Sequence, residues 1–274
     1  MKKNNLTITL IIPYYSNMFS TFYTLEIIKE ASKAAIKLGA DLLIATAWKN
    51  HSSAGVLFAD AMDNERWIKK ARKEKIPYLL LNYYDAASKD NCIGIDNAKA
   101  SFEAVNYLIK SGHRRIATIT GKLNAQAGRD RLAGFKKAVR ANKLDLDKDC
   151  IVTGDWTRES GRGAMKEFLS QDKDSRPTAV FVAGDEMAIG AMEIAKEAGL
   201  RIPEDISFVG FDNVPDAALP GVSLTTIEQP FSDLASLGME NLIKVIKNKS
   251  KPPIKILLDN TRLIKRTSVK ELLR

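Results

Sequence analysis

Short apolar, β-branched runs alternate along this chain with segments of helical periodicity, and this alternation constrains the fold more than any other feature. Strands are predicted over residues 7–12, 41–47, 55–59, 78–82, 92–95, 116–120, 179–183 and 207–211. Helices are predicted over residues 21–38, 65–74, 98–111, 131–142, 159–170, 187–198 and 232–248. The strands are continuously apolar rather than alternating, which indicates burial on both faces. The pattern therefore predicts an α/β protein with parallel sheets covered by helices.

One connection is too short for this pattern. The predicted strands 41–47 and 55–59 are separated by little more than Lys49–Ala54. A crossover between neighbouring parallel strands needs about a dozen residues, usually a helix. Either these strands are not parallel neighbours, or the sequence lacks a helix at this point. We expect the second, because every other crossover has its helix.

Length and composition exclude several classes of protein. The 274 residues are 45% hydrophobic and 27% charged, which is typical of a globular chain of two domains and not of a disordered one. Cys92 and Cys150 are too few for a disulfide framework and lack CxxC spacing, so we expect a reduced, cytoplasmic protein. Leu6–Ile12 follows two lysines, but no small-residue cleavage pattern comes after it, and we interpret it as a buried strand.

The charge balance is positive, with 42 Lys and Arg against 33 Asp and Glu and a formal net charge of +9. The basic residues are interleaved with acidic ones along the predicted helices, as around Lys69–Lys73. The sequence contains no block of five or six consecutive basic residues. This pattern is typical of a solvated, lysine-rich surface rather than of a nucleic-acid-binding segment.

Motifs for catalysis or metal binding are absent from the sequence. It contains two histidines, His51 and His113, and no HExxH, GxSxG or GxxxxGK[ST] motif; Gly161–Ala164 does not complete GxGxxG. We therefore assign no catalytic residue, metal or cofactor, and we expect a binding protein rather than an enzyme.

Polar and aromatic side chains follow the predicted strands, where ligands bind in open α/β sheets. Trp156 has polar neighbours, which favours exposure to a cleft over a core position. Arg131 is interpreted as a ligand contact, the alternative being a surface ion pair with Asp130 or Asp155. An Asp at a strand-to-helix turn is commonly a helix N-cap. That role is open for Asp96 and favoured for Asp185, whereas ligand binding is favoured for Asp212.

Several motifs, in this order and spacing, resemble one known family. They are SNMF at 16–19, SGHRRI at 111–116, RLAGF at 131–135, RPTAVF at 176–181, IPEDISFVGFDN at 202–213, LTTI at 224–227 and QP at 229–230. Almost end to end, from Leu6 to about Val269, the chain resembles the effector-binding core of LacI/GalR-type transcriptional regulators.

The resemblance implies a periplasmic-binding-protein-like fold of two Rossmann-like subdomains with parallel sheets and a ligand cleft between them. The implied N-terminal subdomain is 6–112 plus 230–247, and the C-terminal one is 113–229 plus 251–268. Only five residues precede the strand predicted at Leu6–Ile12, so we expect the family's N-terminal helix-turn-helix, which reads operator DNA, to be absent from this chain. The implied ligand contacts are Tyr15, Phe19, Asp96, Arg131, Trp156, Asp212 and Gln229.

The implied function is that of an effector-sensing, homodimeric core whose ligand alters DNA binding by the full-length protein. An indole face beside carboxylate and guanidinium groups suits a sugar or sugar derivative, and a purine-like heterocycle would use the same groups. The alternative function is that of an exported solute-binding protein of a transporter, which shares the fold.

Overall fold

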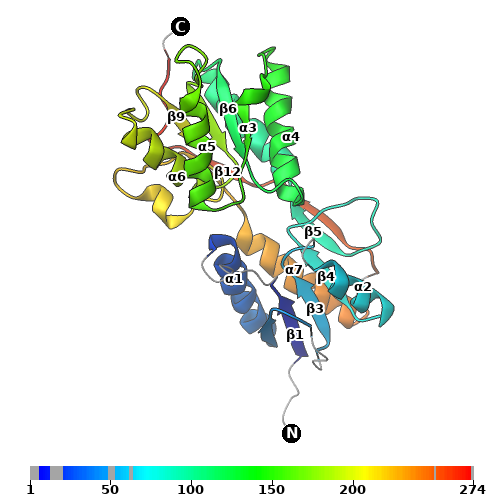
Figure 1. Cartoon of the computed structure of the whole chain (residues 1–274). Coiled ribbons are helices and arrows are strands. Elements are labelled where there is room, and N and C mark those ends of the chain that lie inside the picture. The colour runs from blue at the N-terminus through cyan, green and yellow to red at the C-terminus, as the bar shows by residue number, and fades with distance from the viewer. Residues whose placement is uncertain (1–5, 13–20, 49–52, 62–63, 250, 273–274) are drawn as a thin grey trace. The chain divides into compact units, whose positions relative to one another are not determined.

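The chain folds into two compact units, which Figure 1 shows with the order of their helices and strands. The computed structural model describes residues 6–12, 21–48, 53–61, 64–249 and 251–272. The first unit combines Met1–Ile95 with Pro230–Leu258, and the second combines Asp96–Gln229 with Asp259–Arg274. The chain therefore passes between the units three times.

The first unit is built on a six-stranded, wholly parallel sheet. Its elements are β1 (Leu6–Ile11), α1 (Phe22–Leu38), β2 (Ala40–Ala45), β3 (Gly55–Phe58), α2 (Glu65–Lys73), β4 (Tyr78–Leu81), β5 (Cys92–Ile95), α7 (Phe231–Ile246) and β11 (Lys255–Leu258). The strand order is β11-β5-β4-β3-β1-β2. The last strand of this sheet thus comes from the far end of the sequence.

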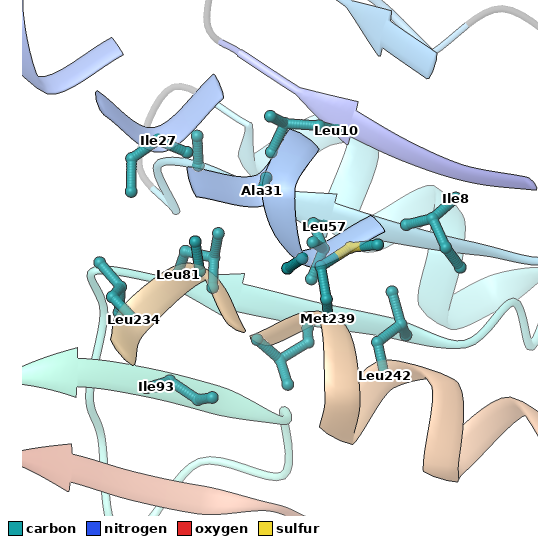
Figure 2. Packing of buried hydrophobic residues seen from close by; sticks show 14 of the residues in the cluster. Ile8, Leu10, Ile27, Ala31, Leu57, Leu81, Ile93, Leu234, Met239 and Leu242 are labelled. Atoms are coloured by element: carbon teal, nitrogen blue, oxygen red, sulfur yellow. The ribbon is translucent and has the colours of Figure 1, made fainter. Parts of the chain in front are cut away.

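Side chains alternate between the two faces of this sheet, and both faces are covered. Ile8, Leu57 and Ile93 point to the face on which α1 and α7 pack, as Figure 2 shows with Met239 of α7 among them. Phe58 belongs to the opposite face, where α2 packs. Burial on both faces explains why the strands are continuously apolar in sequence.

The short connection after β2 has an unexpected topology. β2 and β3 are not neighbours, because each pairs with β1, on opposite sides of it. Trp48, in this connection, is buried in the cluster that contains Phe58. The question of a helix missing near residues 49–55 falls on residues 49–52, which lie outside the described residues.

The second unit has a four-stranded parallel sheet with helices on both faces. Its elements are α3 (Asn97–Lys110), β6 (Ile116–Thr120), α4 (Gln126–Ala141), a 3-10 turn (Lys148–Cys150), β7 (Ile151–Thr153), α5 (Arg158–Ser170), β8 (Ala179–Val182), α6 (Asp185–Glu197), β9 (Ser207–Val209), a second 3-10 turn (Pro215–Ala218), β10 (Thr226–Glu228) and β12 (Arg262–Ile264). The sheet order is β7-β6-β8-β9, and β10 pairs separately with β12 in antiparallel fashion. Helices α3 and α4 pack together, as do α5 and α6 (Figure 1).

The predicted α/β class with parallel sheets is confirmed, and each of the eight predicted strands matches a strand of the structure. Two outcomes differ from expectation. Helix α4 begins at Gln126, five residues before the predicted start at Arg131. The strands β7, β10, β11 and β12 lie outside the eight predicted ranges. Among the described residues, no helix combines the length and apolar character needed to cross a membrane.

The boundaries between the units differ from those implied by the resemblance. Residues 97–110 form α3, which packs on α4 and therefore belongs to the second unit rather than the first. Residues 255–258 form β11, which pairs with β5 and therefore belongs to the first unit rather than the second. Packing partners, which are distant in sequence, decide both assignments.

Two helical glycines offer a matched test of the α3–α4 contact. A Cβ at Gly134 would lie 2.3 Å from the carbonyl oxygen of Ala98, whereas a Cβ at Gly163 would meet nothing within 4 Å. We expect Gly134→Ala to lower the free energy of unfolding by about 1–3 kcal/mol through overpacking. Gly163→Ala should raise it by up to about 1 kcal/mol. Urea denaturation of both variants measures the difference, and equal stabilities would contradict the close approach of α3 and α4.

Candidate functional site

The carboxyl ends of the four parallel strands in the second unit lie at one edge of the sheet, and each strand is followed within two residues by glycine. These residues are Gly121, Gly154, Gly184 and Gly210. A Cβ at Gly121 would lie 1.8 Å from Cη2 of Trp156, and one at Gly210 would lie 2.1 Å from Oδ1 of Asp185. Gly121 and Gly210 therefore leave no room for a side chain, because side chains from other segments lie directly on their backbone.

Trp156 lies across this edge. Its ring covers Gly121 and also approaches Gly184, where a Cβ would be 3.5 Å from Cε3 of the indole. The residue is half-buried and adopts a φ of 78°, a backbone conformation that is unusual for a bulky side chain. Strained backbone of this kind is often found at functional sites.

Arg131 projects from α4 into the same edge and is 3% exposed. Its Nε donates to Oδ1 of Asn97 at 2.9 Å, and its Nη1 donates to the carbonyl oxygen of Ala183. Its Cζ lies 3.6 Å from the ring centroid of Phe211 and 5.5 Å from that of Trp156. The guanidinium is therefore fixed between aromatic rings.

Asp212 is the ion-pair partner of this guanidinium. Nη1 of Arg131 lies 3.5 Å from Oδ1 of Asp212, and Nε2 of Gln229 donates to the same oxygen. A surface ion pair of Arg131 with Asp130 or Asp155 is not formed. Asp212 has a φ of 118° and caps no helix. Burial raises the pKa of Asp212 to about 6, and the charge of Arg131 opposes that shift.

Asp185 lies beside this pair and is fully buried. Its carboxylate accepts hydrogen bonds from the backbone N–H of Val214 and the hydroxyl of Thr226, at 2.9 and 2.6 Å. The N-cap of α6 is Gly184, so the interpretation of Asp185 as a helix cap was wrong. Burial, and secondarily the nearby charge of Asp212, raise the pKa of Asp185 well above its ordinary value.

The other predicted contacts have different surroundings. Asp96 is the N-cap of α3, because its carboxylate accepts from the N–H of Lys99 at 2.9 Å. Gln229 is buried, and its Oε1 has no hydrogen-bond partner among the described residues. Tyr15 and Phe19 lie outside the described residues.

The structure thus brings together Arg131, Trp156, Asp212 and Gln229 at one sheet edge. Sequence reasoning missed Asn97 and Phe211, which hold the guanidinium of Arg131. A glycine soon after each strand is a sequence signal that could have marked this edge. A separate cavity of about 120 Å³ in the second unit is lined by residues such as Lys196 and Ser268. It is smaller than the roughly 300–1,000 Å³ of ordinary ligand pockets.

Comparisons with known proteins relate the chain to one family. Residues 105–269 match the model of the periplasmic binding protein-like domain. The chain is 37% identical over 262 residues to the HTH-type transcriptional repressor PurR of Shigella dysenteriae, covering 90% of this chain and 76% of the repressor. The chain belongs to the LacI/GalR family. It is the ligand-binding core of a LacI/GalR-type transcriptional regulator.

Solved structures of transcriptional regulators are similar over nearly the whole chain. A transcriptional regulator LacI from Bacillus cereus has a TM-score of 0.89 and 25% identity, with 98% of this chain and all of that chain covered. The complex of the transcriptional regulator CelR with cellobiose has a TM-score of 0.88 and 26% identity, covering 96% of this chain and 84% of that chain. The alternative of an exported solute-binding protein is not favoured, because these similar proteins are transcriptional regulators.

The buried carboxyl of Asp185 predicts a pH-dependent stability. Its pKa in the folded chain lies above the ordinary 3.8, so the folded chain holds a proton that the unfolded chain releases above about pH 4. The stability that this proton contributes is complete below pH 3.8 and is lost as the pH rises through the raised pKa. Asp185→Asn removes the titration and can keep both hydrogen bonds.

We therefore expect the free energy of unfolding of Asp185→Asn, relative to that of the natural chain, to increase between pH 4 and pH 8. Each unit of raised pKa corresponds to about 1.4 kcal/mol. Urea denaturation at pH 4, 6 and 8 measures this difference. A difference that stays constant with pH would show that Asp185 does not titrate in this range.

Proposed function

We propose that this regulator senses a sugar or sugar derivative that binds at the carboxyl edge of the second unit's sheet. The observation that carries the proposal is the convergence of three groups: the guanidinium of Arg131 lies 3.5 Å from the carboxylate of Asp212 and 5.5 Å from the ring of Trp156. A donor, an acceptor and a flat apolar surface are the groups that bind a polyhydroxy ring.

Each of these residues retains an atom for a ligand. Nη2 of Arg131 donates to none of the described residues, whereas its Nε and Nη1 are already engaged. A hydroxyl pair on a sugar can accept from Nη2 of Arg131 and donate to Asp212. Oε1 of Gln229, which has no partner among the described residues, can accept a third hydrogen bond from the ligand. Asp96, Tyr15 and Phe19 are the remaining proposed ligand contacts.

The similar regulator CelR was solved as a complex with cellobiose, which supports a sugar as the first class to test. A purine-like heterocycle is the second class. Its ring would stack on Trp156, and its nitrogens would hydrogen-bond to Arg131 and Asp212. The two classes differ in the group that meets Asp212. In a sugar the carboxylate accepts from hydroxyl groups, whereas in a purine-like heterocycle it hydrogen-bonds to ring nitrogens.

Ligand binding would act on the segments of chain that connect the two units, because residues next to these segments are hydrogen-bonded to the proposed ligand contacts. Arg131 is hydrogen-bonded to Asn97, which follows the first passage, and Asp212 is hydrogen-bonded to Gln229, which precedes the second. A ligand that binds one arrangement of these residues more tightly shifts the population toward it. In the full-length regulator this shift would alter binding to operator DNA through a helix-turn-helix domain.

The regulator would act without catalysis, as a cytoplasmic homodimer. Support for a second copy comes from the edge strand β2 of the first unit, where Leu43 and Ile44 are 36% and 40% exposed. An edge strand with exposed apolar side chains favours association with another chain.

Substitution of Asp212 tests the ligand site. Asp212→Asn retains the shape of the side chain but removes the charge, and we expect it to weaken ligand binding by about 10- to 100-fold. Asp216→Asn, a nearby variant whose exposed carboxylate pairs with Arg158, should bind as the natural chain does. Thermal shift and calorimetry with glucose, cellobiose, ribose, adenine and hypoxanthine measure both variants. Equal affinities for the two variants would exclude Asp212 from the site.

Trp156 provides an independent optical test. The other tryptophans, Trp48 and Trp67, belong to the first unit, so the fluorescence of Trp156 should report binding at the second unit's sheet edge. Trp156→Phe should abolish the change in fluorescence while the thermal shift persists, because a phenyl ring still covers the ligand. A ligand that shifts the melting temperature of the natural chain without altering Trp156 fluorescence would contradict the proposed position of the indole.

A further inference from the structure

The positive charge of the chain is unevenly divided between the two units. The first unit contains 18 Lys and Arg against 11 Asp and Glu, and the second contains 24 against 22. Most of the net charge of +9 therefore lies in the first unit, which is the smaller of the two. This excess suggests a surface of that unit that faces a polyanion.

Seven lysines gather at one edge of the first unit's sheet. Because every strand of this sheet is parallel, each helix returns antiparallel to the strands and ends at the edge where the strands begin. The seven are the lysines in or directly after the last turns of α1, α2 and α7, namely Lys37, Lys73, Lys75, Lys244, Lys247, Lys249 and Lys251. We name this set the lysine edge.

The ends of these elements meet in space. A Cβ at Gly55, the first residue of β3, would lie 2.8 Å from Cδ1 of Ile246 and 3.1 Å from the carbonyl oxygen of Pro77. Ile246 ends α7, and Pro77 directly precedes β4, so the last turn of α7 lies beside the connection that contains Lys75. Helix α1, which ends at the same edge of the sheet, packs on α7, so the three segments of the lysine edge adjoin one another.

All seven side chains are exposed, and none forms an ion pair with a described residue. Other cations of the first unit do form ion pairs, as Lys33 does with Glu30 and, in the last turn of α2, Arg72 does with Asp90. The acidic residues at this edge include Asp41, Glu74 and Asp90; Glu74 pairs with Lys70 at 4.0 Å, and Asp90 pairs with Arg72. The charge of the lysine edge is therefore largely uncompensated.

Helix dipoles account for only part of this arrangement. A cation in the last turn of a helix is stabilised by the carbonyl end, which explains Lys37, Lys73 and Lys244. Lys75, Lys247, Lys249 and Lys251 lie beyond the last turns, where the dipole effect falls off. These four have no partner within the described part of the fold and suit an external anion.

We propose that the lysine edge contacts the phosphodiester backbone of duplex DNA without reading its sequence. Six strands about 4.8 Å apart span about 24 Å, over which duplex DNA carries roughly 14 phosphate charges. The unpaired cations of this edge are lysines, since Arg72 is paired with Asp90. Lysine binds phosphate as a point charge, whereas arginine is the residue that reads guanine bidentately. This contact adds to any reading of operator DNA by another domain, and it does not depend on the effector proposed above.

Charge-matched variants of the full chain test the proposal. The edge variant carries Lys75→Gln, Lys247→Gln, Lys249→Gln and Lys251→Gln. The control variant carries Lys136→Gln, Lys143→Gln, Lys148→Gln and Lys166→Gln, four exposed lysines of the second unit. Both variants lose four positive charges, and Lys75 and Lys143 share a positive φ, at 55° and 54°. Circular dichroism of both variants serves as the control that they are folded.

The measurement is the fluorescence anisotropy of a labelled duplex of arbitrary sequence between 50 and 200 mM salt. At the lowest salt we expect the edge variant to bind at least about tenfold more weakly than the natural chain. Its plot of log K against log salt should be shallower by up to about 0.9 for each lysine removed. The control variant should remain close to the natural chain.

Equal losses in both variants would overturn the proposal, because net charge alone would then explain binding. Undetectable binding of the natural chain at 50 mM salt would also overturn it. The same titration with vesicles of anionic phospholipid completes the test. Vesicle binding that depends on the edge lysines, with DNA binding that does not, would assign this surface to a membrane instead.

Discussion

The buried guanidinium of Arg131 is the interaction on which the carboxyl edge of the second unit depends. A charge removed from water is costly unless it is paired and hydrogen-bonded, and leaving such a charge unpaired costs several kcal/mol. The hydrogen-bond partners of Arg131 come from α3, from the segment after β8 and from the segment after β9. Each of these segments must stay in place for the buried charge to remain paired. One charge thus fixes the relative positions of three segments that are distant in sequence.

The cluster has a second consequence, because its members lie next to the passages between the units. Asn97 follows one passage and Gln229 precedes another, and both are hydrogen-bonded to the proposed ligand-binding pair. The neighbouring carboxyl of Asp185 is fully buried, and burial together with the charge of Asp212 disfavours its ionisation. A site with several coupled, buried polar groups responds as a unit to a ligand that satisfies one of them.

Parallel strands give the two edges of each sheet different chemistry. The carboxyl edge of the second unit combines glycines with an ion pair and an indole, whereas the amino edge of the first unit collects exposed lysines. The same topology explains both, since helices begin at the carboxyl edge and end at the amino edge. The two proposed contacts thus use different kinds of edge, the carboxyl edge of one unit's sheet for a small ligand and the amino edge of the other unit's sheet for DNA.

By itself, the sequence determined the fold class, the strands and the family, because apolar runs and glycine-rich motifs are local signals. It also indicated Arg131, Trp156 and Asp212 as a set. Tertiary structure alone decided that Asp185 is buried instead of capping α6, that α3 belongs with α4, and that lysines from three segments share one edge. Each of these depends on contacts between residues far apart in the chain, which no local pattern of side chains encodes.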